Sequence, residues 1–165
     1  MNKYKYVPTK HTSEVLAYFA GIIDGEGSFF IGNFSSNPKT GTPHYQTCIQ
    51  VANTDKILID WLYDNFGGER YTYTPKQLPK GSRKPVYSWK ANGERLTHLC
   101  NSILPYLVIK KDQAELMLKM RATFTKTGVQ KGKQGIQPVT QEIADERLSY
   151  FKQLQKLHTR NRTEK

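Results

Sequence analysis

Acidic and glycine residues alternate in AGIIDGEGSFF, Ala20–Phe30, where an apolar helical pattern changes into a strand pattern. Asp24 and Glu26 are separated by Gly25 and followed by Gly27. A carboxylate at a helix C-terminus is unfavourable, because the partial charge of the helix dipole there is also negative. Two acids at this place therefore predict a compensating cation, and a divalent metal is the candidate.

The segment does not fit a calcium-binding helix–loop–helix site. Asp24, Glu26 and Ser28 alternate as such ligands do, but that loop needs Gly at its sixth position and Glu at its twelfth. Those positions are Phe29 and Ser35. One chain offers one carboxylate with nearby backbone carbonyls, and two chains meeting here would bring two such acids together. That is the geometry of two-metal phosphodiester hydrolysis.

The helix before these acids has a face almost without side chains. Ala17, Ala20, Gly21 and Asp24 recur at i, i+3, i+4 and i+7. Small residues on one helix face allow another backbone to approach closely. A second copy of the chain or the chain's own sheet could occupy this face.

Composition favours a nucleic-acid partner. The 165 residues fit one domain and include 25 Lys and Arg against 14 Asp and Glu, a formal charge of +11. Such an excess indicates a polyanionic partner, with simple solubility as the alternative. Cys48 and Cys100 are too few for a disulfide scaffold or a zinc cage. The longest apolar run, Val15–Ile23, is far below the ~20 residues that span a bilayer, so we expect no membrane partner.

The periodicity predicts an α+β protein with helices on one face of an antiparallel sheet, which leaves the other face free. We expect helices over 12–24, 55–66, 94–104, 111–124 and 141–158, and strands over 29–34, 45–52, 70–74 and 86–91. A basic, glycine-containing linker over 126–138 is expected to separate a core, 1–125, from a C-terminal helix and basic tail, 139–165.

Three segments resemble the LAGLIDADG homing endonucleases. LAYFAGIIDGEGSF, Leu16–Phe29, resembles their signature, with Phe19–Gly27 on the signature positions. IQVANTDKILIDWLYDNFGG, Ile49–Gly68, is similar to the family's strand-into-helix segment, and ILPYLVIKKDQAELML, Ile103–Leu118, resembles its Pro-apolar-Lys-Lys-Gln-Ala segment. The resemblance covers about residues 12–120. It implies an αββαββα core with a saddle-shaped antiparallel sheet, followed by a C-terminal helix.

The resemblance also implies a metal-dependent active site. The last signature acid, Glu26, would bind the metal together with the carbonyl of Gly25, while Asn53 would position the attacking water. Lys110 would support catalysis, and Lys111 is the alternative if the match slips by one residue. The implied cofactor is Mg²⁺, with Mn²⁺ as a substitute and Ca²⁺ supporting DNA binding without turnover.

Two further positions follow from the same resemblance. Asp24, the first signature acid, is expected to serve the helix end and the chain–chain interface. An arginine that some relatives carry near the start of the second helix is not matched, and either Lys56 or no residue takes its place.

The concave face of such a sheet would lie in the DNA major groove and present alternate strand residues to base edges. Strand alternation predicts these contacts for His44, Gln46, Gln50, Arg70, Thr72, Ser88 and Lys90. Basic residues in the hairpin turns are expected at phosphates: Lys39, Lys76, Lys80, Arg83 and Lys84. Phe30, Gly32 and Phe34 would follow the same parity on the first strand, but their apolar character leaves the register open.

The predicted function is an intron-encoded, site-specific double-strand DNA endonuclease. Because the chain has one signature copy, we expect a homodimer through Ala17, Ala20, Gly21 and Asp24, acting on a long, pseudo-palindromic duplex. The alternatives are an intron RNA maturase and a non-cleaving DNA-binding protein of the same fold; the presence of Glu26 and Lys110 favours the nuclease. The expected location is the compartment of its own gene, an organelle or a bacterial or phage cytoplasm.

Overall fold

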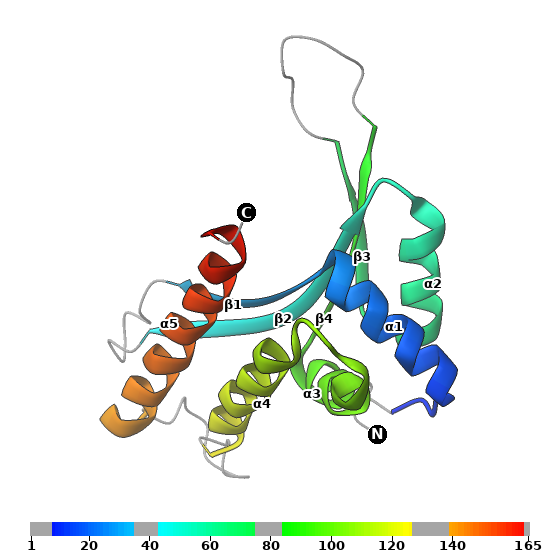
Figure 1. The fold of residues 1–165 in the computed structure, drawn as a ribbon. Helices are drawn as coiled ribbons and strands as arrows, with labels where there is room; N and C mark the ends of the chain where they lie inside the picture. The colour runs from blue at the N-terminus through cyan, green and yellow to red at the C-terminus, as the bar shows by residue number, and fades with distance from the viewer. Residues whose placement is uncertain (1–7, 35–42, 75–83, 127–138, 164–165) are drawn as a thin grey trace, which may run out of the picture.

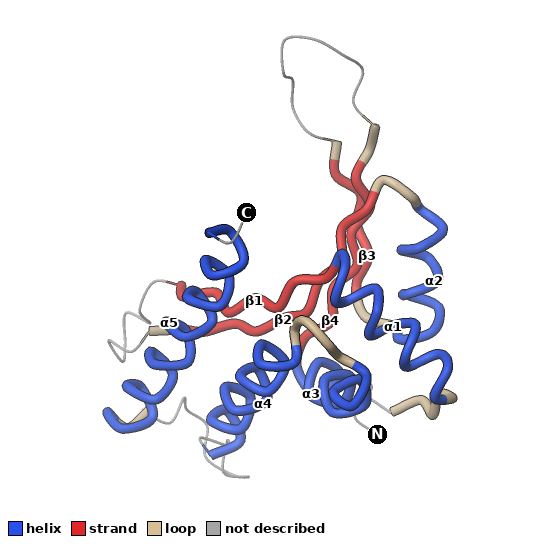
Figure 2. The backbone as a smooth tube through the Cα atoms, in the orientation of Figure 1, coloured by secondary structure: helices blue, strands red, loops and turns tan. Residues whose placement is uncertain are grey.

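The computed structural model describes residues 8–34, 43–74, 84–126 and 139–163. Figures 1 and 2 show an α+β fold in which helices lie on one side of a single curved sheet. The elements in chain order are α1 Ser13–Glu26, β1 Gly27–Phe34, β2 His44–Asn53, α2 Lys56–Phe66, β3 Glu69–Tyr73, β4 Val86–Asn92, α3 Gly93–Ile103, the 3₁₀ turn η1 Leu104–Tyr106, α4 Lys111–Lys126 and α5 Gln141–Thr163.

The sheet is antiparallel throughout, with strand order β1-β2-β4-β3. Its register aligns one row across all four strands, Ser28 with Gln50, Gln50 with Lys90, and Lys90 with Glu69. Helices α1 to α5 cover one face, α5 through Phe151, whose ring lies 6.0 Å from that of Tyr45. The other face is concave and lies between the β3–β4 hairpin and the C-terminal part of α5 (Figures 1 and 2).

Alternation along the strands decides which face is buried. Phe29, Ile49, Val51 and Trp89 are fully buried on the helix side. There Phe19 of α1 stacks on a phenyl ring of α2 at 4.1 Å between centroids. Fully buried large side chains on one parity of β1, β2 and β4, against mostly half-buried or exposed residues on the other, are the pattern of an antiparallel sheet with one covered face. The predicted fold class is confirmed.

We call the uncovered side the open face. By register it presents Ser28, Phe30, Gly32 and Phe34 of β1, His44, Gln46, Cys48, Gln50 and Ala52 of β2, Ser88, Lys90 and Asn92 of β4, and Glu69, Tyr71 and Tyr73 of β3.

Helix and strand boundaries agree with the sequence pattern to within a few residues, with three differences. Helix α1 runs to Glu26 and β1 begins at Gly27 without an intervening turn. Lys126 ends α4, whereas the sequence placed it in the linker. α5 extends to Thr163 and packs on α4 through Arg147, whose guanidinium donates to the Thr123 hydroxyl at 2.9 Å. Within the described ranges, no helix combines the length and apolar character needed to cross a bilayer.

Candidate active site

The junction between α1 and β1 is built around Gly27. A Cβ at this residue would lie 2.7 Å from Ile23 Cα and 2.8 Å from its carbonyl oxygen, so a side chain does not fit. The strand can therefore leave directly from the helix end. This places Glu26 at the last position of α1, exposed, beside the start of the open face, with an exposed Gly25 before it.

Asp24 and Lys110 bind each other's backbone at this junction. The Asp24 carboxylate accepts hydrogen bonds from the backbone N–H groups of Val108, at 2.8 Å, and Lys110, at 2.9 Å. In return, Lys110 Nζ donates to the carbonyl oxygens of Ile23 and Asp24, both at 2.9 Å, and of Gly27 at 2.7 Å. The cation that compensates the helix end is therefore Lys110. The helix end therefore needs no metal to compensate its dipole, and the metal at Glu26 stays a prediction.

All three hydrogens of the Lys110 ammonium are donated within the chain. Burial lowers the pKa of Lys110, while the nearby Asp24 and Glu26 carboxylates oppose that shift. Lys110 therefore fixes the end of α1 that carries Glu26. Lys111, the alternative in the sequence match, is exposed at the start of α4 and makes none of these bonds.

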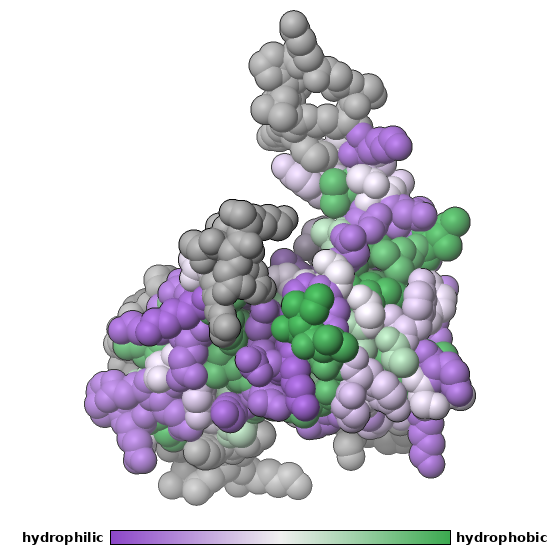
Figure 3. Space-filling view, in the orientation of Figure 1, coloured by the Kyte–Doolittle hydropathy of each residue, from purple (hydrophilic) through white to green (hydrophobic). Residues whose placement is uncertain are grey.

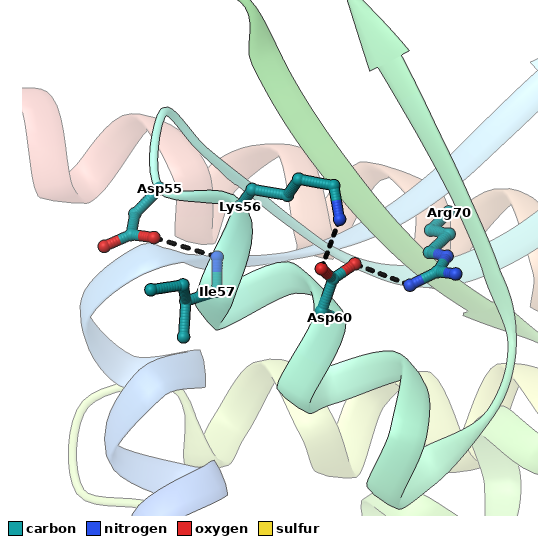
Figure 4. Close-up of polar contacts among 5 residues, drawn as sticks. All are labelled: Asp55, Lys56, Ile57, Asp60 and Arg70. Atoms are coloured by element: carbon teal, nitrogen blue, oxygen red, sulfur yellow. Dashed lines mark hydrogen bonds and ion pairs between the residues drawn. The ribbon is translucent and has the colours of Figure 1, made fainter.

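Asn53 lies at the same end of the β1–β2 pair as Glu26, because Gly27 pairs with Val51. Its side-chain oxygen accepts the backbone N–H of Asp55 at 2.9 Å, just before α2 begins. Lys56 forms an ion pair with Asp60 of the same helix, as Figure 4 shows.

Arg70 and Thr72, predicted at the DNA, lie on the helix side of the sheet. They pair with Trp89 and Tyr87. Arg70 is bound to Asp60 of α2 (Figure 4). This assignment is corrected by the register, since a shift of one residue moves every side chain of a strand to the other face.

The other strand residues predicted at base edges lie together on the open face: His44, Gln46, Gln50, Ser88 and Lys90. Lys84 is exposed just before β4. The remaining predicted phosphate contacts lie outside the described residues: Lys39, Lys76, Lys80 and Arg83.

Two polar groups near this face were missed by sequence reasoning. On the face itself, Glu69 lies 3.3 Å from Lys90 Nζ and accepts from the Asn92 amide at 3.2 Å, so an acid holds two polar side chains of the open face. At its edge, where β4 ends, Arg121 of α4 lines a hollow of about 630 Å³ together with residues of both sides of β2. Glu69 could have been found from strand parity with the correct register, whereas nothing in the local sequence points to Arg121.

The structure also changes which residues form the exposed small-residue face of α1. Ala20 is fully buried in the chain's own core, so its assignment to a dimer interface is corrected. The exposed small residues are Ala17, Gly21 and Gly25, spaced four apart. A Cβ at Gly21 or Gly25 would meet nothing within 4 Å.

Exposed apolar side chains lie beside this stripe. Val108 is 84% exposed and Ile109 is 66% exposed, directly before Lys110 in the loop that the Asp24 carboxylate binds. Figure 3 shows a hydrophobic cluster over this loop, with hydrophilic surface on its left in this view.

No protein-family profile matches the sequence, and no curated protein matches it closely enough to count as a relative. Solved structures do match. One is the homing endonuclease I-CvuI in complex with its target, with a TM-score of 0.65 and 17% identity over 87% of this chain and 82% of that chain. Another is the archaeal intron-encoded homing endonuclease I-Vdi141I complexed with DNA, with a TM-score of 0.67 and 14% identity over 87% and 84%.

A third match is the LAGLIDADG homing endonuclease I-SmaMI bound to cleaved DNA. Its TM-score is 0.61 and its identity 22%, over 82% of this chain but 42% of that chain. The chain has the fold of the LAGLIDADG homing endonucleases.

Proposed function

We propose that the protein is a site-specific double-strand DNA endonuclease that acts as a homodimer with a divalent metal. The observation that supports it most is the exposed Glu26 at the end of α1, on a helix end fixed by Asp24 and Lys110 beside the open face. A fold alone does not imply a function, so the proposal rests on this site.

The oxygen donors at the C-terminal end of α1 are of the kind that a hard cation binds. Glu26 supplies a carboxylate, and the neighbouring Gly25 is exposed with a backbone carbonyl, which are the oxygen ligands that Mg²⁺ and Ca²⁺ prefer. Asp24 is already committed to the backbone N–H groups of the 108–110 loop. Among the described residues, no three His, Cys, Asp or Glu side chains form a group that could hold a metal. A complete site therefore needs donors from a second chain and from DNA phosphates.

Each residue has a distinct part in this mechanism. Glu26 would hold the metal, the Gly25 carbonyl would add a second oxygen, and Asn53 would orient the attacking water. Lys110 keeps Glu26 in place by binding the carbonyls around it. When bound, the metal would activate water near pH 7 and stabilise charge on the scissile phosphate. I-CvuI was crystallised with its target in the presence of Ca, and I-SmaMI with uncleaved DNA in the presence of calcium ions.

Two surfaces support a homodimer. The exposed stripe of Ala17, Gly21 and Gly25 allows two α1 helices to approach closely. Val108 and Ile109 add exposed apolar side chains beside the end of α1, and burying them would favour association. The chain aligns with less than half of I-SmaMI, so two copies match the size of that protein. Pairing at α1 would bring the two Glu26 residues together.

The proposal is tested by selecting bound duplexes from a randomised library in Ca²⁺ and then replacing Ca²⁺ with Mg²⁺. We expect a long, pseudo-palindromic consensus and a double-strand break at one position within it, read by sequencing the cut ends. If the selected duplex binds tightly but stays intact in both Mg²⁺ and Mn²⁺, the protein binds DNA and is not a nuclease.

A further inference from the structure

Two phenylalanines of β1 are exposed on the open face. Phe30 is 44% exposed and Phe34 is 46% exposed, although large apolar side chains usually lie in a core. Both have the strand parity opposite to the buried Phe29 and Ile31, so neither contributes to the covered side of the sheet. Their exposure therefore calls for a partner on the open face.

Gly32, between them, brings the two rings together. A Cβ at Gly32 would lie 2.6 Å from Phe34 Cε2 and 2.9 Å from Phe30 Cε1, so both rings lean over the glycine backbone. Any larger residue would push them apart. The result is one continuous apolar surface, which we call the phenyl pair.

Hydrogen-bonding side chains of β2 lie directly beside the phenyl pair. Gln46 is opposite Gly32, and His44 is opposite Phe34 with 6.5 Å between ring centroids. In the major groove, a glutamine amide can bind the N6 and N7 of adenine, and a phenyl group can contact the C5-methyl of thymine. The two kinds of contact suit the two bases of A·T pairs.

From this arrangement we infer that the phenyl pair reads thymine methyl groups, with Gln46 reading adenine beside it. The inference rests on the proposed DNA function and adds a base preference to it. Phe30 and Phe34 follow Glu26 by four and eight residues along β1. At about 3.3 Å per strand residue and about 3.4 Å per base pair, the preferred A·T pairs lie roughly four to eight pairs from the cut in each half-site.

The test measures binding of the duplex selected from the randomised library, in Ca²⁺. Each thymine in that interval is compared with deoxyuridine and with 5-bromodeoxyuridine at the same position. Deoxyuridine lacks the methyl group and keeps every hydrogen bond, while 5-bromodeoxyuridine restores an apolar substituent of similar size. We expect deoxyuridine to weaken binding about fourfold per contacted methyl, and 5-bromodeoxyuridine to restore it.

Variants assign the effect to the rings. In Phe30→Ala with Phe34→Ala, the affinities for thymine and deoxyuridine duplexes should become equal. Tyr73→Ala is the matched control, because Tyr73 is an exposed aromatic at the far edge of the same face, and it should keep the wild-type ratio.

Equal wild-type affinity for thymine and deoxyuridine duplexes, or a selected consensus without A·T pairs in the interval, would overturn the inference and leave the proposed function standing. The double variant could instead keep the difference between thymine and deoxyuridine duplexes and change its association state in sedimentation. That result would assign the phenyl pair to protein–protein contact. A library that yields no consensus would overturn both the inference and the proposed function.

Discussion

Asp24 and Lys110 explain why an acid can stand at a helix C-terminus in this chain. The carboxylate binds two backbone N–H groups, and the ammonium binds three carbonyls, so each side chain satisfies groups that the helix end and the loop leave without partners. The Lys110 ammonium also offsets the helix dipole, whose negative end lies here. The end of α1 that carries Glu26 is therefore held by hydrogen bonds within the chain.

Asp24→Ala should lower the free energy of unfolding by about 1–3 kcal/mol, because the backbone N–H groups of Val108 and Lys110 lose their acceptor. Lys110→Met should do the same by leaving three carbonyls without a donor. Urea denaturation followed by circular dichroism measures both. Asp64→Asn, an exposed change on α2, is the control and should stay within about 0.5 kcal/mol of the wild type. Stabilities of both variants equal to this control would show that the observed bonds do not fix the junction.

At the scale of elements, the register of β3 decides which basic residues can reach DNA. Lys90 lies on the open face, whereas Arg70, on the neighbouring strand, faces Asp60 on the helix side. Lys90→Ala should weaken DNA binding and make it less dependent on salt, because it removes a positive charge from the face proposed to meet the DNA. Arg70→Ala, with the same loss of charge, should change binding less; filter binding at several salt concentrations compares them. A larger loss for Arg70→Ala would mean that the other face of β3 contacts the DNA.

Dimer formation should depend on the exposed stripe of α1. Gly21→Leu places a bulky side chain where the backbone of a second helix would pass, so sedimentation should show a monomer. Asn101→Leu adds similar bulk to an exposed position of α3 and should leave the dimer intact. A Gly21→Leu dimer as tight as the wild type would place the interface elsewhere.

Hydrophobic periodicity was enough to predict the helices and strands. Strand parity grouped Gln46 with Gln50 on β2 and Ser88 with Lys90 on β4, and only the register shows that the two groups share one face. The sequence could not decide the parity of β3, because every residue of this short strand is exposed and carries no burial signal. Ala20 and Gly21 could not be told apart from the sequence, because both are small and only packing distinguishes a buried alanine from an exposed glycine. The bonds of Lys110 to α1 join residues more than 80 positions apart, which local pattern does not reveal.

For the whole molecule, the excess of positive charge predicts binding that is strongly dependent on salt. Two chains would each carry a formal charge of +11, concentrated by the dimer along one duplex. If six phosphates are neutralised, affinity should fall about a thousandfold between 50 and 200 mM salt. Fluorescence anisotropy with the selected duplex measures this slope. Affinity unchanged over that range would contradict a phosphate-based interface.

The central claim is that Glu26 of each copy holds the catalytic metal, and Glu26→Gln tests it most directly. The amide keeps the size of the side chain and removes the charge that a hard cation needs. Glu69→Gln is the matched control, because it makes the same chemical change on the open face, away from the end of α1.

The measurement is cleavage of the selected duplex in Mg²⁺, with binding to the same duplex in Ca²⁺ as the check on folding. Glu26→Gln should bind the duplex and cut it at least about a thousandfold more slowly, since a metal supplies several kcal/mol of transition-state stabilisation. Glu69→Gln should cut it. Cleavage by Glu26→Gln at the wild-type rate would contradict the account.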